Sequence, residues 1–208
     1  IVPARYDVTN TYVSNDVTGV SSQVTFSAGT TTFSGNLVLD TTSTSGPVRV
    51  NNTTTDANIV VLGNITNGPD ANDVTSYWTA GNGNITLSGT HTQNLKIAQL
   101  GLESIIVSKT ANRAQLISTG SIANLTINAG TFAQQSYAFD INGDLTINAG
   151  TYNNGGGALT LGGDMENAGG TFTSATGSVV LDGTDQTING SNSFYNFTKN
   201  ASVTSTLT

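Results

Sequence analysis

The sequence predicts an all-β fold, a right-handed parallel β-helix (β-solenoid) with about twenty residues per coil, and two observations support this prediction. First, Asn-Ala-Gly-Thr followed by an aromatic residue occurs at 128–132 and 148–152 and returns, one glycine longer, at 167–172. The three aromatic residues are therefore spaced by 152 − 132 = 20 and 172 − 152 = 20. Second, apolar and polar residues alternate at 125–127 and 145–147, which is typical of strands with one buried face. A strand-like repeat of this length indicates coils that stack on one another.

Further positions repeat in the same register. The glycines at 143, 163 and 183 form one column, and we expect them at corners where the chain adopts a positive φ and a side chain would crowd the next coil. We expect Phe132, Tyr152 and Phe172 to form an aromatic stack inside the coils. The alternative is an antiparallel β-sandwich, because two strands and two turns of a meander would give the same period.

The chain divides into two parts. Residues 1–20 do not match the repeat and are expected to form an N-terminal arm, which adds to the strand edge of a neighbouring subunit, or a capping coil. Residues 21–208 are expected to form the β-solenoid, with short strands at 24–26, 37–39 and 59–62 separated by Gly, Asn, Asp, Ser and Thr. The final segment 201–208 alternates like a strand, and an exposed strand edge there favours a covering partner.

Composition excludes several classes of function. Of 208 residues only 9 % are charged, and the net charge is −7, which disfavours nucleic acid and anionic membrane surfaces as partners. No apolar run approaches the roughly 18 residues of a transmembrane helix, so no membrane insertion is expected. The chain has no cysteine and a single histidine, which excludes thiolate chemistry and histidine-based triads. A surface of hydroxyl and amide groups with few charges indicates an extracellular or cell-surface location.

Three segments carry a family resemblance. Residues 63–68 and 78–90 resemble the repeats of large bacterial surface proteins of the haemagglutinin and autotransporter-passenger kind, and residues 177–190 are similar to repeats in giant extracellular bacterial proteins. The resemblance implies adhesins and components of filaments or surface layers. It implies no catalytic residues, so we expect the chain not to be an enzyme.

These features together predict an extracellular structural protein. The expected role is a self-assembling subunit of a filament, sheath or surface layer, in which copies of the chain join end to end through β-strand contacts. An adhesin stalk is the alternative, with surface glycans as partners. A β-helix enzyme acting on polysaccharide is the third candidate.

Carboxylates at one corner suggest two kinds of site. Asp140, Asn142 and Asp144 place oxygen atoms at alternate positions, as in the opening of a calcium loop, although the glycine and glutamate of an EF-hand are missing. Asp144 and Asp164 should stack roughly 5 Å apart, a separation found between the carboxyl groups of retaining glycosidases. Aspartates next to corner glycines are also ordinary turn residues. Calcium is therefore the cofactor candidate, and solvated turn carboxylates are the simpler interpretation.

Tyr77 and Trp78 form the one pair of adjacent large aromatic residues before the C-terminal segment. In an exposed loop the indole could stack on a sugar ring, which makes this pair the candidate glycan site. The other interpretation is that Trp78 fills the core.

Overall fold

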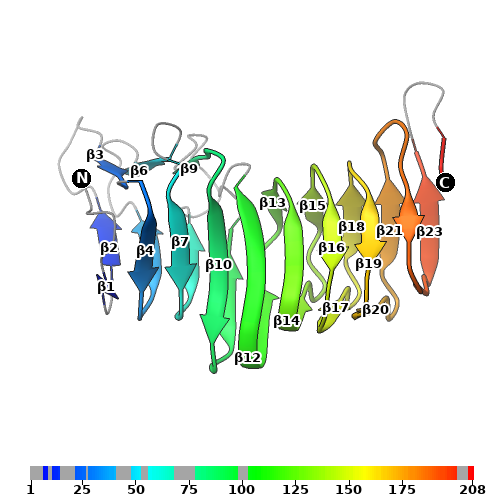
Figure 1. Cartoon of the computed structure of the whole chain (residues 1–208), viewed down its shortest axis with the longest axis horizontal. Helices are drawn as coiled ribbons and strands as arrows, with labels where there is room; N and C mark the ends of the chain where they lie inside the picture. The colour runs from blue at the N-terminus through cyan, green and yellow to red at the C-terminus, as the bar shows by residue number, and fades with distance from the viewer. Residues whose placement is uncertain are drawn as a thin grey trace.

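The computed structural model is an all-β structure in which the described strands pair in parallel. The structure describes residues 7–8, 11–14, 22–26, 28–40, 48–52, 56–67, 78–97, 103–200 and 206–208, and these ranges contain no helix. Figure 1 shows the strands side by side along the long axis, with the two termini at opposite ends. The predicted parallel β-solenoid is confirmed, and the antiparallel sandwich is wrong because neighbouring strands run in the same direction.

Each coil contributes strands to three faces. The first face stacks β1 (Asp7–Val8), β4 (Thr30–Phe33), β7 (Asn58–Val61), β10 (Asn84–Gly89), the first parts of β12 (Ser104–Leu116) and β14 (Leu125–Ala133), β16 (Leu145–Ile147), β19 (Met165–Asn167) and β22 (Ile188–Asn189). The second face stacks β2 (Thr11–Ser14), β5 (Leu37–Asp40), β8 (Ile65–Asn67), β11 (Gln93–Lys96), the second parts of β12 and β14, β17 (Thr151–Asn153) and β20 (Thr171–Thr173). The third position in the coils holds two sheets, β3 (Ser22–Thr25), β6 (Val48–Asn51) and β9 (Trp78–Thr79), then β13 (Gly120–Ile122), β15 (Phe139–Ile141), β18 (Ala158–Leu161), β21 (Ser178–Leu181) and β23 (Asn196–Lys199).

The period of twenty holds for the C-terminal part of the solenoid. Leu125 pairs with Leu145 and Leu145 with Met165, so these partners differ by 145 − 125 = 20 and 165 − 145 = 20. Earlier coils are longer: Thr31 pairs with Ile59, a difference of 59 − 31 = 28, and Ile65 pairs with Leu95, a difference of 95 − 65 = 30. Strands β4 to β8 of these early coils have three or four residues, as do β15 to β21, so the additional residues lie in the connections, where insertions leave the stacking of strands intact.

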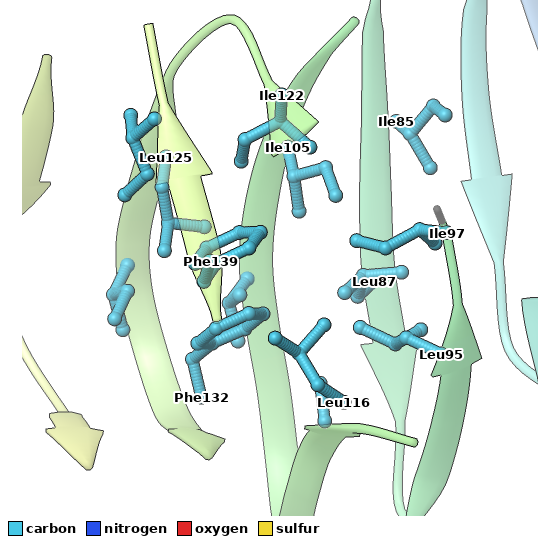
Figure 2. Close-up of a cluster of buried hydrophobic side chains, with 14 of the residues drawn as sticks. Ile85, Leu87, Leu95, Ile97, Ile105, Leu116, Ile122, Leu125, Phe132 and Phe139 are labelled. Atoms are coloured by element: carbon cyan, nitrogen blue, oxygen red, sulfur yellow. The ribbon is translucent and has the colours of Figure 1, made fainter. Parts of the chain in front are cut away.

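Inward side chains form the core. Along most of the strands whose burial is described, buried and more exposed residues alternate, as in the buried, intermediate, buried pattern of both β15 and β16. Figure 2 shows side chains from different faces, including Ile105, Leu125 and Phe139, pointing into one common interior. The burial of each such side chain stabilises the fold by about 1.5–3 kcal/mol.

The predicted aromatic stack is confirmed. The ring centroids of Phe132 and Tyr152 are 5.6 Å apart, and those of Tyr152 and Phe172 are 5.3 Å apart with planes inclined by 13°. The hydroxyl of buried Tyr152 donates to Gln134 Oε1 at 2.7 Å, and burial raises its pKa well above the ordinary value. The stack therefore has a polar partner for its one phenol.

The glycine column at 143, 163 and 183 is needed for space. A Cβ at Gly163 would collide with Asp144 Oδ1 and with the backbone of Gly143, and a Cβ at Gly183 would collide with the carbonyl of Gly162. The predicted positive φ is wrong for this column, because a positive φ occurs instead at Gly130 (79°) and Gly150 (81°), the glycines of the Asn-Ala-Gly repeat. The column at 143, 163 and 183 thus meets one constraint, close approach, whereas Gly130 and Gly150 meet both close approach and left-handed backbone, because a Cβ at Gly150 would also collide with the carbonyl of Gly130.

A glutamine and a lysine tie three successive coils together at one corner. Gln93 Nε2 donates to the carbonyls of Val61 (2.9 Å) and Gly63 (2.6 Å) in the preceding coil. Lys109 from the following coil donates to Gln93 Oε1 at 2.8 Å and, at longer range, to the carbonyls of Ser88 and Gly89. Gln93 and Lys109 are both buried.

The same arrangement recurs at a different corner. Gln186 Nε2 donates to the carbonyls of Leu161 and Gly163, and Lys199 donates to Gln186 Oε1 at 2.7 Å and to the carbonyls of Gly183 and Thr184. In the first copy the glutamine begins β11, just after the corner that follows β10, whereas in the second copy it lies in the corner between β21 and β22. We call each copy a Gln–Lys staple; its recurrence shows that it fits more than one corner of the coil.

We expect Lys109→Met to lower the free energy of unfolding by about 1–3 kcal/mol, because it leaves Gln93 Oε1 buried without a donor. Urea unfolding of Lys109→Met, Gln93→Leu and the double variant measures the coupling between the two side chains. The double variant should lose less than the sum of the single losses. Additive losses, or a Lys109→Met variant as stable as the wild type, would contradict the staple.

Candidate functional site

The paired aspartates Asp144 and Asp164 lie on adjacent coils, and both carboxylates bind backbone. Asp144 Oδ1 accepts the N–H of Asp164 at 2.8 Å, and Asp164 Oδ1 accepts the N–H of Thr187 at 2.7 Å. Asn124 does the same one coil earlier, since its Oδ1 accepts the N–H of Asp144 at 2.8 Å. An amide at the first position shows that this corner needs an oxygen acceptor and not a charge.

Equivalent ladders occur at other corners. Asn36 Oδ1 accepts the N–H of Asn64, and Asn64 Oδ1 accepts the N–H of Asn94, both at 2.8 Å. Asp56 Oδ1 accepts the N–H of Asn82 at 2.7 Å. In each case the acceptor lies in the earlier coil and the donor in the later one. We call these contacts Asx ladders.

Replacement of Asp164 by Asn should leave the free energy of unfolding unchanged within about 0.5 kcal/mol, because the Oδ1 acceptor for Thr187 is kept. Asp164→Ala should lose about 0.5–1.5 kcal/mol, because that acceptor is removed. Urea unfolding of both variants at the same pH checks this pair. Equal losses in the Asn and Ala variants would show that the charge of the carboxylate is what stabilises this corner.

The predicted calcium ligands Asp140, Asn142 and Asp144 have separate partners. Asp140 Oδ2 accepts a long hydrogen bond from Ser121 Oγ at 3.4 Å, while Asn142 Nδ2 donates to Ser121 Oγ at 2.8 Å and to the carbonyl of Ile122. Asp144 belongs to its Asx ladder. The structure thus brings Asp140 and Asn142 together through Ser121 and uses Asp144 elsewhere. Within the described ranges, no three His, Cys, Asp or Glu side chains form a group suited to a metal ion.

A trough lies on the outer face of the sheet that begins with β13. Its volume is about 210 Å³, and the residues that line it are Thr119, Gly120, Ser121, Ala138, Phe139, Asp140 and Thr160. Ser121 pairs with Asp140 and Asp140 with Thr160, so three polar side chains from successive coils form one outward column. We call this feature the Asp140 trough.

The carboxyl of Asp140 has an altered affinity for protons. Burial raises its pKa, the nearby charge of Asp182 raises it further, and the hydrogen bond from Ser121 opposes the rise. Asp140 is half-buried, whereas Asp182 is exposed. The trough therefore combines one partly desolvated carboxyl group with hydroxyl groups.

Trp78 lies in the core and is 1 % exposed. Its ring packs against Phe26 with the centroids 6.5 Å apart. The indole therefore offers no exposed face to a sugar ring, and the interpretation of Trp78 as a core residue accounts for its position. Tyr77, the other member of the predicted glycan pair, lies outside the described residues.

Glu103 is a fully buried acid next to Trp78. Its Oε1 accepts from Asn52 Nδ2 at 2.6 Å, and its Oε2 accepts the N–H of Gly81 at 3.1 Å. A Cβ at Gly81 would collide with the carbonyl of Asn52, so only glycine allows this close approach between the two backbones. Burial raises the pKa of Glu103, and the hydrogen bonds from Asn52, Gly81 and Trp78 oppose the rise.

This shift predicts a pH dependence of stability. Because the pKa of Glu103 is higher in the folded than in the unfolded state, its contribution is fully present below the unfolded-state pKa and is lost as the pH rises through the folded-state pKa. We expect Glu103→Gln to remove this part of the slope when urea unfolding is measured from about pH 4 to about pH 8. Asp140→Asn is the control for the second raised carboxyl group; an unchanged slope in Glu103→Gln would contradict the assignment.

The last coil exposes apolar side chains. Phe194 extends the aromatic stack, with its centroid 5.4 Å from that of Phe172 and 5.0 Å from that of Phe197. Tyr195, Phe197 and Leu207 are 64 %, 37 % and 41 % exposed. Among the described strands, β23 pairs with β21 alone. The edge of β22 that faces away from β19 is covered by residues 206–208, because the N–H of Ile188 donates to the carbonyl of Thr208 at 2.9 Å and Gln186 forms a parallel bridge with Leu207. We call Tyr195, Phe197 and Leu207, with the outer edge of β23, the C-terminal end surface. Figure 1 shows β23 at the C-terminal end of the row of strands.

Comparison of the chain with family models, with curated proteins and with solved structures gives no match. The described part of the chain contains no helix with the length and hydrophobicity of a membrane span. The parallel stacking of its coils makes this chain a β-solenoid repeat protein. Its function is inferred below from its own residues.

Sequence reasoning missed the buried polar residues. The Gln–Lys staples and Glu103 carry no repeat of twenty, because Gln93 and Gln186 lie at different corners. A local signal does exist: Gly89-Thr90 precedes Gln93, and Gly183-Thr184 precedes Gln186. A Gly-Thr pair followed by glutamine within a few residues, with a lysine in the next coil, would have predicted both staples.

Proposed function

We propose that this chain is an extracellular structural protein whose solenoids stack end to end into a filament, sheath or surface layer. The observation that carries the proposal is the C-terminal end surface, which offers the outer edge of β23 and exposed aromatic rings in continuation of the internal stack. Exposed strand edges and apolar rings of this kind favour association with further β-structure. The same contacts that hold coil on coil within the chain would hold one copy on the next.

The Asx ladders give this stacking a direction. Each ladder acceptor lies in the earlier coil and binds a backbone N–H of the later one, as in Asp185 Oδ1 with Thr206 at 2.9 Å. The last coil of one copy would therefore supply the acceptors, and the first coil of the next copy would supply the backbone N–H groups. A contact between unlike ends does not close on itself and produces fibres.

At the other end, β1 and β2 stack as a coil. They pair in parallel with β4 and β5, and Val8 lies opposite Phe33. We infer that this first coil, within residues 1–20, covers the C-terminal end surface of the neighbouring copy. The hydroxyl-rich and amide-rich composition, with 9 % charged residues, supports a location outside the cell.

The proposal predicts filaments or sheets that depend on the C-terminal end surface. The double variant Tyr195→Asp and Phe197→Asp should abolish them, because charged side chains at the joint would be desolvated on assembly. Ile117→Asp is the matched control, since Ile117 is 44 % exposed and lies on β12's connection to β13, away from the last coil. Electron microscopy and sedimentation of the three proteins, with circular dichroism for strand content, measure assembly.

Removal of residues 1–20 tests the other half of the joint and should also prevent assembly. Dispersed rods of the wild type at every concentration would overturn self-assembly. That result would favour the second candidate, an adhesin stalk, for which a continuous core along the rod is sufficient.

A further inference from the structure

We propose that the Asp140 trough is a binding site for a single neutral sugar ring. This inference goes beyond the proposed structural role, because the trough lies on the side of the solenoid and the assembly joint lies at its ends. It rests on the shape of the trough, on the hydrogen-bonding groups that line it and on the charges around it.

The shape of the trough follows from small residues beside a polar column. Ala138 lies in the lining and its small side chain leaves space on the outer face. Gly120 also lies in the lining, but a Cβ there would point into the core and collide with Ile97. The resulting volume of about 210 Å³ is below the roughly 300–1,000 Å³ of pockets for drug-sized ligands, so it suits one ring. Phe139 contributes to the lining although its side chain is 1 % exposed, so the trough is underlain by the packed core.

The hydrogen-bonding groups match a polyhydroxyl ligand. Asp140 has one long hydrogen bond, from Ser121, which leaves most of the acceptor positions of its carboxylate free for ligand hydroxyl groups. Thr119 and Thr160 add hydroxyl groups that can both donate and accept. Asn142 holds Ser121 in place by donating to its Oγ at 2.8 Å. A ligand with adjacent hydroxyl groups can donate to Asp140 and accept from the threonines.

The surrounding charges select against anions. Asp140 lies close enough to Asp182 for their charges to interact, and the whole chain carries a net charge of −7. A sugar carrying carboxylate or sulfate groups would be repelled, whereas a neutral ring would meet no electrostatic penalty.

The test is a titration of the isotopically labelled full chain, followed by NMR, with methyl glycosides of common neutral monosaccharides in the presence of a calcium chelator. We expect shift changes at residues 119–121, 138–140 and 160. Asp140→Ala should weaken binding at least 10-fold and Thr160→Val about 3-fold, since a charged acceptor contributes more than a neutral hydroxyl group. Asp164→Asn, which changes an exposed carboxylate outside the trough, should bind as the wild type does.

Three outcomes would overturn the proposal: no shift change with any neutral glycoside at millimolar concentration, shift changes that map outside the trough, or a response to calcium alone. Ser121→Ala provides a second trough variant if Asp140→Ala alters the spectrum of the free protein. Because the assembly variants at Tyr195 and Phe197 leave the trough intact, sugar binding and filament formation can fail independently.

Discussion

In-register parallel stacking of neighbouring coils is the constraint on which the rest of this structure depends. Stacked strands lie about 4.8 Å apart, so each position in one coil meets the same position in the next at nearly fixed distance. Leu125, Leu145 and Met165 are therefore forced into one column, as are the rings of Phe132, Tyr152 and Phe172. The constraint is tighter at the corners, because the backbones of neighbouring coils are in contact there and only glycine fits at 163 and 183.

Polar residues inside a stack have few ways to find partners. A buried amide or ammonium group must be satisfied within its own column or by the coils on either side, since an unpaired one costs about 1–3 kcal/mol. The Gln–Lys staples and the contact of Glu103 with Asn52 are solutions to this problem, and each reaches across coils. The Asx ladders solve it at the exposed corners with a single oxygen per coil.

The sequence was sufficient for the parallel stack and the aromatic column because these arise from period-two alternation and a period of twenty, both visible from residue 125 onward. It was insufficient for the N-terminal coils, where connections of unequal length stretch the spacing to 28 and 30 and hide the repeat. The sequence did not distinguish the roles of Asp140 and Asp144, because both are carboxylates at alternate positions. In the structure Asp144 accepts a backbone N–H in an Asx ladder, whereas Asp140 lies on the outer face beside Ser121. Trp78 is not part of the period-twenty repeat, so the sequence did not show that its side chain points into the core.

Stacking also determines where a binding site can arise in such a protein. Inward positions are committed to the core and corner positions to backbone contacts, so only outward columns are free to vary. Along the column of Ser121, Asp140 and Thr160 the side chains differ from coil to coil, whereas the inward partners Ile122, Ile141 and Leu161 stay aliphatic. Stacking does not require a carboxylate in an outward column, and the column of Thr126, Thr146 and Glu166 carries one outside the trough. Asp140 differs from Glu166 because it is half-buried and lines a trough. This is why we propose the Asp140 trough, rather than the better-aligned pair Asp144 and Asp164, as the place to look for recognition.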